Sequence, residues 1–202
     1  MADPKTIGDW TETVTDLPPN KRYICTHDKD GKSVVHSSPP QLYHGRGGVG
    51  GMARSFATAT IPATLANDAD VSAYLSSTGA TSHLGTDIIV PTQRGANLVV
   101  VDMAPGGQSQ MHRTVSIDFS ICVIGYVRME LDGGEMLDLR PGDHIIQRGT
   151  MHKWYNGSQT EPARFVAVTL PCEPFEIPGT GKMLAEEHIA GSGARQADGS
   201  KL

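Results

Sequence analysis

The residues best able to do chemistry lie in the short segment from His112 to Asp118, which reads His-Arg-Thr-Val-Ser-Ile-Asp. If this segment is extended, its even-numbered residues project to one face, because side chains alternate along a strand. That face then carries an imidazole, two hydroxyls and a carboxylate. Such groups can transfer protons near neutral pH, since imidazole titrates there and a carboxylate can orient or charge it.

A second polar segment begins at His152. His152, Trp154 and Asn156 share one face of another short extended stretch, and a barrel can bring that face opposite the first. Two histidines and one aspartate would then converge. We therefore expect His112, His152 and Asp118 to form the catalytic centre, with either histidine acting as general base or acid.

The same three side chains could instead hold a metal ion. Two imidazoles and one carboxylate form the donor set that Fe(II) accepts while keeping positions open for substrate or oxygen. From the residues alone three possibilities stay open: a metal on His112, Asp118 and His152, acid–base catalysis without a metal, and a pocket without catalysis.

Further residues near these segments are expected to contact a substrate. Thr114 and Trp154 lie on the faces that carry the histidines, and Tyr126 and Arg128 join the face of the aspartate if residues 119–131 form one strand. Arg113 has the opposite parity, so we expect it to be a structural ion-pair partner.

The elements that must position these residues are short strands. Apolar runs are interrupted every 8 to 12 residues by Gly, Pro or Asp, and this spacing is typical of all-β proteins. One short helix is expected within residues 67–78, where Asn and Asp precede an amphipathic turn. The expected strands are 22–26, 33–36, 97–103, 119–131, 136–139, 144–147, 152–155 and 164–170. So many short strands predict a sandwich-like β-barrel.

The 202 residues are enough for one domain with appendages. We expect an N-terminal arm at 1–20, a hairpin, loop and accessory segment at 21–95, a barrel core at 96–175 and a C-terminal extension at 176–202. The glycine-dense stretch from Gly45 to Gly51 is expected to be a mobile loop. The tail from about residue 191 is expected to be disordered, because it contains no residue able to anchor it.

Composition narrows the possible partners. The net charge of −5 argues against binding nucleic acid or an anionic membrane. The three cysteines lie in distant contexts without a CxxC pair, which favours a reducing compartment. There is no apolar stretch of membrane-spanning length and no leader-like N-terminus. We expect a cytoplasmic protein whose partner is a small-molecule substrate.

The two polar segments resemble the two motifs of the cupin superfamily. The first motif, G(X)5HXH(X)3-4E(X)6G, matches Gly106 to Gly125, with His112 at the first histidine and Asp118 at the glutamate. The second, G(X)5PXG(X)2H(X)3N, is similar to Gly142 to Asn156, with His152 at its histidine. Two positions depart from the pattern: Thr114 stands at the second histidine, and the second motif is one residue short with Gln147 in place of the proline.

The resemblance covers most of residues 20–172 and is closest to a subgroup of single-domain cupins in bacteria and fungi, some of them in gene clusters for polyketide-like metabolites. It implies a jelly-roll β-barrel that binds either a divalent metal (Fe, Zn, Mn or Ni) or no cofactor. Because Thr114 replaces one histidine, the full set of four metal ligands is absent. The resemblance also implies oxidoreductase, lyase, isomerase or decarboxylase chemistry, and fold alone does not choose among these.

Combining residues and resemblance, we expect a lyase- or isomerase-type enzyme that moves a proton next to a carbonyl of a polyketide-like or aromatic metabolite. The alternatives are an Fe(II)-dependent oxidoreductase and a non-catalytic small-ligand binder. By analogy with such barrels we also expect a homodimer in which the N-terminal arm crosses to the second copy.

Overall fold

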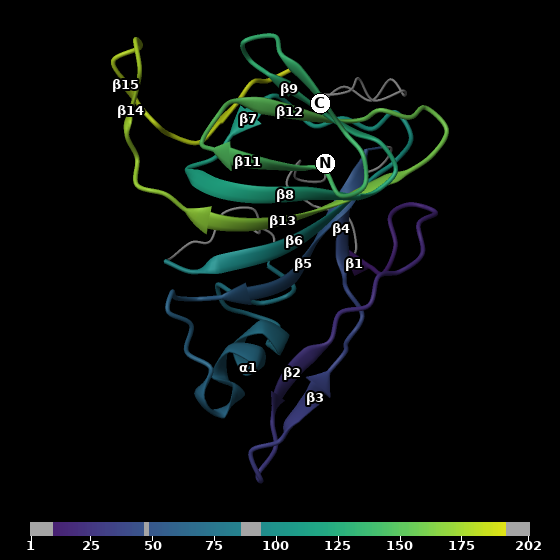
Figure 1. Ribbon diagram of the computed structural model, residues 1–202, viewed down its shortest axis with the longest axis vertical. Helices are drawn as coiled ribbons and strands as arrows, with labels where there is room; N and C mark the ends of the chain where they lie inside the picture. Colours follow the sequence, from purple (N-terminus) through teal and green to yellow (C-terminus); the bar gives the residue numbers. More distant parts are fainter. Residues whose placement is uncertain (1–9, 47–48, 86–93, 193–202) are drawn as a thin grey trace, which may run out of the picture.

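The computed structural model describes residues 10–46, 49–85 and 94–192, and within these residues the strands form two large antiparallel sheets around a common interior (Figure 1). The seven-stranded sheet has the order β1 (Trp10–Thr11), β4 (Tyr43–Arg46), β5 (Gly50–Thr58), β6 (Ala96–Met103), β13 (Ala163–Pro171), β8 (Ser116–Ile124) and β11 (His144–Arg148). The five-stranded sheet has the order β10 (Met136–Leu139), β9 (Val127–Leu131), β12 (His152–Asn156), β7 (His112–Arg113) and β16 (Glu187–His188). The predicted all-β barrel is confirmed.

The main hydrophobic core fills the space between the two sheets. At its centre the rings of Trp154 from β12 and Phe165 from β13 stack with centroids 4.6 Å apart. Each sheet contributes alternate residues, as the pleat requires. The buried members are Met103, Cys122, Val127, Met129, Leu139, Trp154, Ala163, Phe165 and Ala167.

The chain changes sheets at both ends of β8. It leaves the five-stranded sheet after β7, passes through Thr114 and Val115, and enters the seven-stranded sheet at Ser116. At the other end Gly125, with φ of 81°, turns the chain back toward β9. The single strand expected at 119–131 is therefore wrong, because a left-handed glycine interrupts it and the two halves join different sheets.

Of the stretch from Gly45 to Gly51, expected to be a mobile loop, residues 45–46 and 50–51 lie in paired strands, and residues 47–48 fall outside the described residues. β4 and β5 pair antiparallel, with Gly45 opposite Gly51. Glycine is required at Gly50, since a Cβ there would lie 2.0 Å from the carbonyl oxygen of Asp102. The seven-stranded sheet thus begins well before residue 96, where the barrel core was expected to start.

The predicted hairpin and short helix are confirmed, and they form a lobe below the barrel in Figure 1. The hairpin consists of β2 (Ile24–His27) and β3 (Ser33–Ser37), and the 3-10 turn η1 (Ala66–Asp68) leads into helix α1 (Ala69–Leu75). Ile24 of the hairpin packs with Val71 and Tyr74 of the helix in a second core cluster.

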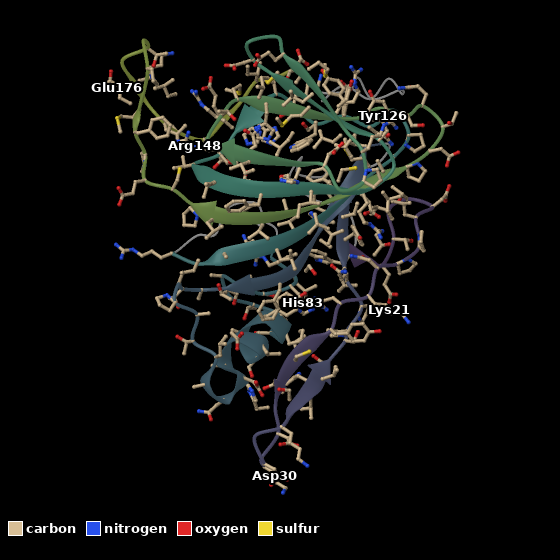
Figure 2. The ribbon with its side chains drawn as sticks, in the orientation of Figure 1. Lys21, Asp30, His83, Tyr126, Arg148 and Glu176 are labelled. Atoms are coloured by element: carbon tan, nitrogen blue, oxygen red, sulfur yellow. The ribbon has the colours of Figure 1, made fainter. Side chains whose placement is uncertain are left out.

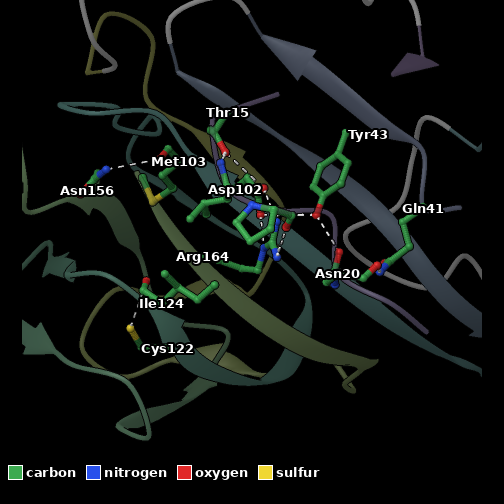
Figure 3. Close-up of polar contacts among 12 residues, drawn as sticks. Thr15, Asn20, Gln41, Tyr43, Asp102, Met103, Cys122, Ile124, Asn156 and Arg164 are labelled. Atoms are coloured by element: carbon green, nitrogen blue, oxygen red, sulfur yellow. Dashed lines mark hydrogen bonds and ion pairs between the residues drawn. The ribbon is translucent and has the colours of Figure 1, made fainter. Parts of the chain in front are cut away.

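A buried ion pair attaches the N-terminal arm to the seven-stranded sheet (Figure 3). Arg164 donates from Nε and Nη2 to the two carboxylate oxygens of Asp102, at 2.6 and 2.7 Å. Its third nitrogen donates to the carbonyl oxygen of Pro18 at 3.1 Å, and the Tyr43 hydroxyl donates to Asp102 at 3.4 Å. Burial, followed by the nearby Asp102 carboxylate, raises the pKa of Tyr43. Residues 10–20 of the arm contact the barrel of their own chain, through the pairing of β1 with β4 and the contact at Pro18, and the homodimer stays a prediction.

The C-terminal extension is more structured than expected up to Ser192. It contains the small hairpin of β14 (Glu176–Ile177) and β15 (Lys182–Met183), which projects from the upper barrel, and then β16. The tail expected to be disordered from about residue 191 falls, beyond Ser192, outside the described residues. Within the described ranges, no helix has the length and apolar character needed to cross a membrane.

Candidate functional site

The two histidines expected to converge are direct neighbours. His152 of β12 and His112 of β7 are cross-strand partners, and their ring centroids lie 4.4 Å apart. Partners on adjacent strands project to the same side of a sheet. His152 also meets Trp154 edge-on, at 5.8 Å and 84°. Since Trp154 belongs to the core between the sheets, the histidine pair faces the barrel interior.

Backbone carbonyls fix the same tautomer in both rings. Nδ1 of His112 lies 2.8 Å from the carbonyl oxygen of Gln110, and Nδ1 of His152 lies 2.9 Å from that of Thr150. A carbonyl oxygen can only accept a hydrogen bond, so each Nδ1 carries the hydrogen. In a neutral ring Nε2 then holds the lone pair. Both histidines are therefore set up to accept a proton at Nε2.

His152 is held in its neutral form. The side chain is 4% exposed, and burial lowers its pKa from 6.5 to about 4, with a further contribution from the neighbouring His112. The hydrogen bond to Thr150 acts in the opposite direction but is the smaller effect. At neutral pH His152 is thus a base with its lone pair in place.

Asp118 lies on the inner face of β8, alternating with outward residues such as Phe119. It is 7% exposed, and its Oδ1 has no hydrogen-bond partner within the described part of the chain. Burial raises its pKa from 3.8 to about 6, against the smaller effect of the Ser116 hydroxyl. A buried carboxyl with an unsatisfied oxygen is costly unless a ligand or water completes it. Asp118 is therefore suited to hydrogen-bond a bound molecule.

Asp118 does not join the histidine pair in a three-residue ligand set, contrary to the expectation from sequence. No group of three His, Cys, Asp or Glu residues that could hold a metal occurs in the described ranges. The reason is the change of sheet at Thr114 and Val115, which puts His112 on one wall and Asp118 on the other. Catalytic metal sites use about three protein ligands. The two histidines fall short of that number, so the described residues do not fit a catalytic metal ion.

A row of buried polar side chains crosses the inner face of the seven-stranded sheet at Asp118. Register pairs Asp118 with Gln147 on one side and with Thr169 on the other, and Thr169 with Asn97. All four are 7% exposed or less. The row lies beyond the apolar layer formed by residues such as Phe165, so the interior has an apolar part and a polar part. The polar part is the candidate site.

Two of the four expected substrate contacts lie inside the barrel. Thr114 is buried, and its Oγ1 lies 2.7 Å from Oγ of Ser116, which leads along the inner face toward Asp118. Trp154 is buried between the sheets, where it contacts both Phe165 and His152. Both side chains thus lie inside the barrel, and their contact with a substrate stays a prediction.

The other two expected contacts lie on the outer surface. Arg128 donates from Nε to Asp138 at 2.6 Å, and the Tyr126 hydroxyl donates to the same carboxylate oxygen at 2.6 Å. Figure 2 shows Tyr126 at the edge of the barrel. The expected assignment is corrected because Gly125 breaks the strand, so that the alternation counted from Asp118 does not continue through it.

Sequence reasoning missed the C-terminal contribution to the site. His188 of β16 pairs with His112, and their rings stack with centroids 5.6 Å apart at 8°. Arg113 forms an ion pair with Glu187, the structural role expected for it. No spacing rule links residue 188 to the motifs at 112 and 152, and only the pairing of β16 with β7 reveals the contact.

Comparisons with known proteins find one matching family model and several similar proteins. The family model described as "Cupin domain" matches residues 99–169. "Phomopsin biosynthesis cluster protein C'" of Diaporthe leptostromiformis is 40% identical over 78% of this chain and 82% of that protein. "Cupin-domain-containing oxidoreductase fogC" of Aspergillus ruber is 32% identical over 78% of this chain and 75% of its own. Among solved structures, the polyketide cyclase RemF from Streptomyces resistomycificus is 23% identical over 46% of this chain and 60% of that chain, with a TM-score of 0.37.

Proposed function

Because the chain belongs to the cupin superfamily, we propose that it transforms a small secondary metabolite by moving a proton next to a carbonyl group. The observation that carries this proposal is the buried, neutral imidazole of His152, whose Nε2 is left as the proton acceptor. The names of relatives as biosynthesis cluster proteins support a metabolite substrate. The reaction class fits a dehydratase, decarboxylase or isomerase.

In the proposed step, Nε2 of His152 takes a proton from the carbon beside the carbonyl. The C–H bond breaks, its electron pair forms a C=C bond, and the carbonyl oxygen becomes an enolate or enol oxygen. Asp118, in its protonated form, donates its hydrogen to that oxygen and so stabilises the developing charge. Return of the proton from His152 to another carbon gives isomerisation, while loss of a leaving group from the neighbouring carbon gives elimination. In both cases the oxygen returns its hydrogen to Asp118 as the C=O bond re-forms. His112 is the second base within reach of His152.

The two protonation states set the pH range of this chemistry. His152 must be neutral and Asp118 must be protonated, and their pKa values of about 4 and about 6 give a window between the two. A bell-shaped dependence of kcat/KM on pH would report the two groups in the free enzyme. The arrangement thus favours activity on the acidic side of neutrality.

The interior favours a flat, largely apolar substrate with one or two oxygen functions. The stacked rings of Trp154 and Phe165 line the apolar part of the interior, and the row at Asp118 carries hydrogen-bonding groups at one end. A pocket that is mostly apolar with a few placed polar groups is typical of small-molecule sites. Polyketide-like and aromatic ketones have this combination of properties.

A second candidate function is oxidation of the same class of metabolite. The specific observation in its favour is the name of the 32% identical relative from Aspergillus ruber as a cupin-domain-containing oxidoreductase. It is tested by oxygen uptake and by the metal content of untagged protein purified without chelator, beside His112→Ala and His152→Ala. Stoichiometric metal that both variants lose, together with oxygen uptake, would favour oxidation.

Proton transfer itself is tested by deuterium exchange. We would incubate the protein with aryl alkyl ketones such as dihydroxyacetophenone in deuterated buffer and follow exchange at the carbon beside the carbonyl by mass spectrometry. His152→Gln should abolish the enzyme-dependent exchange. The matched control is His144→Gln, since His144 is an exposed histidine on β11. Exchange that continues in His152→Gln would refute the assigned base, and tight ligand binding without exchange would indicate a binding protein.

A further inference from the structure

We propose that the C-terminal strap, defined as residues 184–192, is part of the active site and that His188 is a positioning residue for His112. This inference rests on the proposed function for its catalytic meaning, because His112 matters only if the histidine pair moves protons. The structural evidence for it is strand pairing, ring stacking and an ion pair, none of which depends on a substrate.

The strap completes the backbone pairing of β7. That strand is only two residues long, and it lies between β12 and β16 in the five-stranded sheet. His112 pairs with His152 on one side and with His188 on the other. Met111 adds hydrogen bonds to the strap, accepting from the amide of Ile189 at 2.9 Å and donating to Oγ of Ser192 at 2.8 Å. Without β16, β7 would keep only its pairing with β12.

Side chains hold both faces of this strand pair. On one face the ring of His188 stacks parallel to the ring of His112, at 5.6 Å and 8°. On the other face Glu187 accepts a charge-assisted hydrogen bond from Arg113, whose side chain is 15% exposed. The Glu187 side chain is 49% exposed, so this ion pair adds a modest contribution to the backbone pairing. The ring of His112 is thus placed between His152 and His188.

The strap is anchored at its two ends. Leu184 is 3% exposed and packs against Gly149, where an added Cβ would lie 2.7 Å from a Leu184 methyl carbon. At the other end the ammonium of Lys153 donates to the carbonyl oxygen of Ser192. Gly149 directly precedes Thr150, whose carbonyl oxygen sets the tautomer of His152. The strap therefore contacts the segments that orient both histidines.

These contacts restrict how the His112 ring can turn. The ring is half-buried, and its Nδ1 donates a hydrogen bond to the carbonyl oxygen of Gln110. Stacking against His188 limits rotation of the ring further, since a turned ring would lose the parallel contact. The position of Nε2, where a proton is accepted, then depends on a residue that is far away in sequence.

The test compares His188→Ala with His188→Phe in the full chain. Phe keeps a ring that can stack but removes both nitrogens. If stacking positions the His112 ring, His188→Phe should therefore keep that ring in its wild-type position. Long-range 1H–15N spectra of the imidazoles report the tautomer of His112 without any substrate. We expect the wild type and His188→Phe to show the Nδ1–H tautomer of His112, and His188→Ala to show a tautomer mixture. His144→Ala serves as the matched control and should leave the His112 signals unchanged.

Activity gives a second readout. His188→Ala should lower kcat about 10-fold or more with little change in KM, because a misplaced base slows the chemical step more than it weakens binding. His188→Phe should restore kcat. If His188→Ala fails to fold, Glu187→Gln is measured in its place. This variant removes the charge that pairs with Arg113 and so loosens β16, while the ring of His188 is kept. The same tautomer mixture of His112 is expected.

Two results would overturn the inference. A His112 spectrum in His188→Ala identical to that of the wild type would show that the strap does not position the ring. If His188→Phe loses the Nδ1–H tautomer of His112 as fully as His188→Ala does, then the nitrogens of His188, and not its stacking, position the His112 ring. Because the spectra need no substrate, failure of the proposed proton transfer would leave this test intact.

Discussion

Replacing Asp118 with asparagine should stabilise the protein at neutral and alkaline pH and have a much smaller effect in acid. The native pKa of Asp118 is raised from 3.8 to about 6 by burial. The folded state therefore binds the proton more tightly than the unfolded state does. Stability from this group is fully present below pH 3.8 and is lost as pH rises through about 6, because the charged carboxylate must then be buried.

The size of the effect follows from the change in pKa. A difference between 3.8 and about 6 corresponds to about 3 kcal/mol once both states are ionised, at 1.36 kcal/mol for each pKa unit. About half of this penalty is already present at pH 5, since the unfolded carboxyl is then almost fully ionised. An asparagine side chain has nearly the same shape as aspartate and no charge, so Asp118→Asn should remove the penalty at every pH.

Urea denaturation of the wild type and Asp118→Asn, from pH 4 to pH 8, measures the difference directly. Subtracting the two curves cancels the titration of all groups that the variant leaves unchanged, including His152. The free energy of unfolding of the variant should rise relative to the wild type by about 2 to 3 kcal/mol over this range. A difference that stays constant with pH would refute the argument, because it would mean that Asp118 titrates alike in the folded and unfolded chains.

The other predictions concern the proposed base His152, the buried ion pair that attaches the N-terminal arm, and the turn after β8. The native pKa of His152 is about 4 instead of 6.5, so the stability that its neutral ring contributes is lost as pH falls through this range. In urea titrations, the free energy of unfolding of His152→Asn relative to the wild type should therefore be higher at pH 4 than at pH 7, by up to about 3 kcal/mol. Arg164→Met should cost about 3–5 kcal/mol in urea denaturation, because Asp102 would be buried without its partner, and a double variant that also carries Asp102→Asn should recover part of the loss. Gly125→Ala should lower Tm by several degrees in a thermal melt, since its φ is 81° and a Cβ would lie 2.8 Å from the carbonyl oxygen of Pro162; an unchanged Tm would contradict the left-handed turn.

Local patterns in the sequence predicted most of the elements. The strands around residues 97–103, 136–139, 144–147, 152–155 and 164–170 appear close to the expected bounds, because alternating residues between turn signals determine them locally. Each of these strands is determined by a few residues that are neighbours in the sequence. The expected convergence of His112 and His152 is also found, but it arises from direct pairing of β7 with β12 in one sheet and not from barrel closure bringing two faces opposite each other.

Features that depend on distant contacts could not be predicted. Nothing near Gly125 in sequence distinguishes a bulge within one strand from a turn between two sheets, and this choice decided the side on which Tyr126 and Arg128 lie. The glycine-dense stretch suggested mobility, but Gly50 lies in β5 and allows close approach to the backbone of Asp102 in β6. The place of His188 beside His112 depends on β16, a strand of two residues that carries no periodic signal.

The change of sheet between β7 and β8 also determines how the site can widen and narrow. The histidine pair belongs to the five-stranded sheet and Asp118 to the seven-stranded sheet, joined there by Thr114 and Val115 alone. Because the two histidines lie on paired strands of one sheet, a shift of one sheet against the other would keep the distance between the histidines and change their distance to Asp118. A ligand that bridges the two walls would couple their motions, so the amides of β7 and β8 would exchange with solvent more slowly and at a common rate. The distance across the site therefore depends on how the two sheets of the barrel pack against each other.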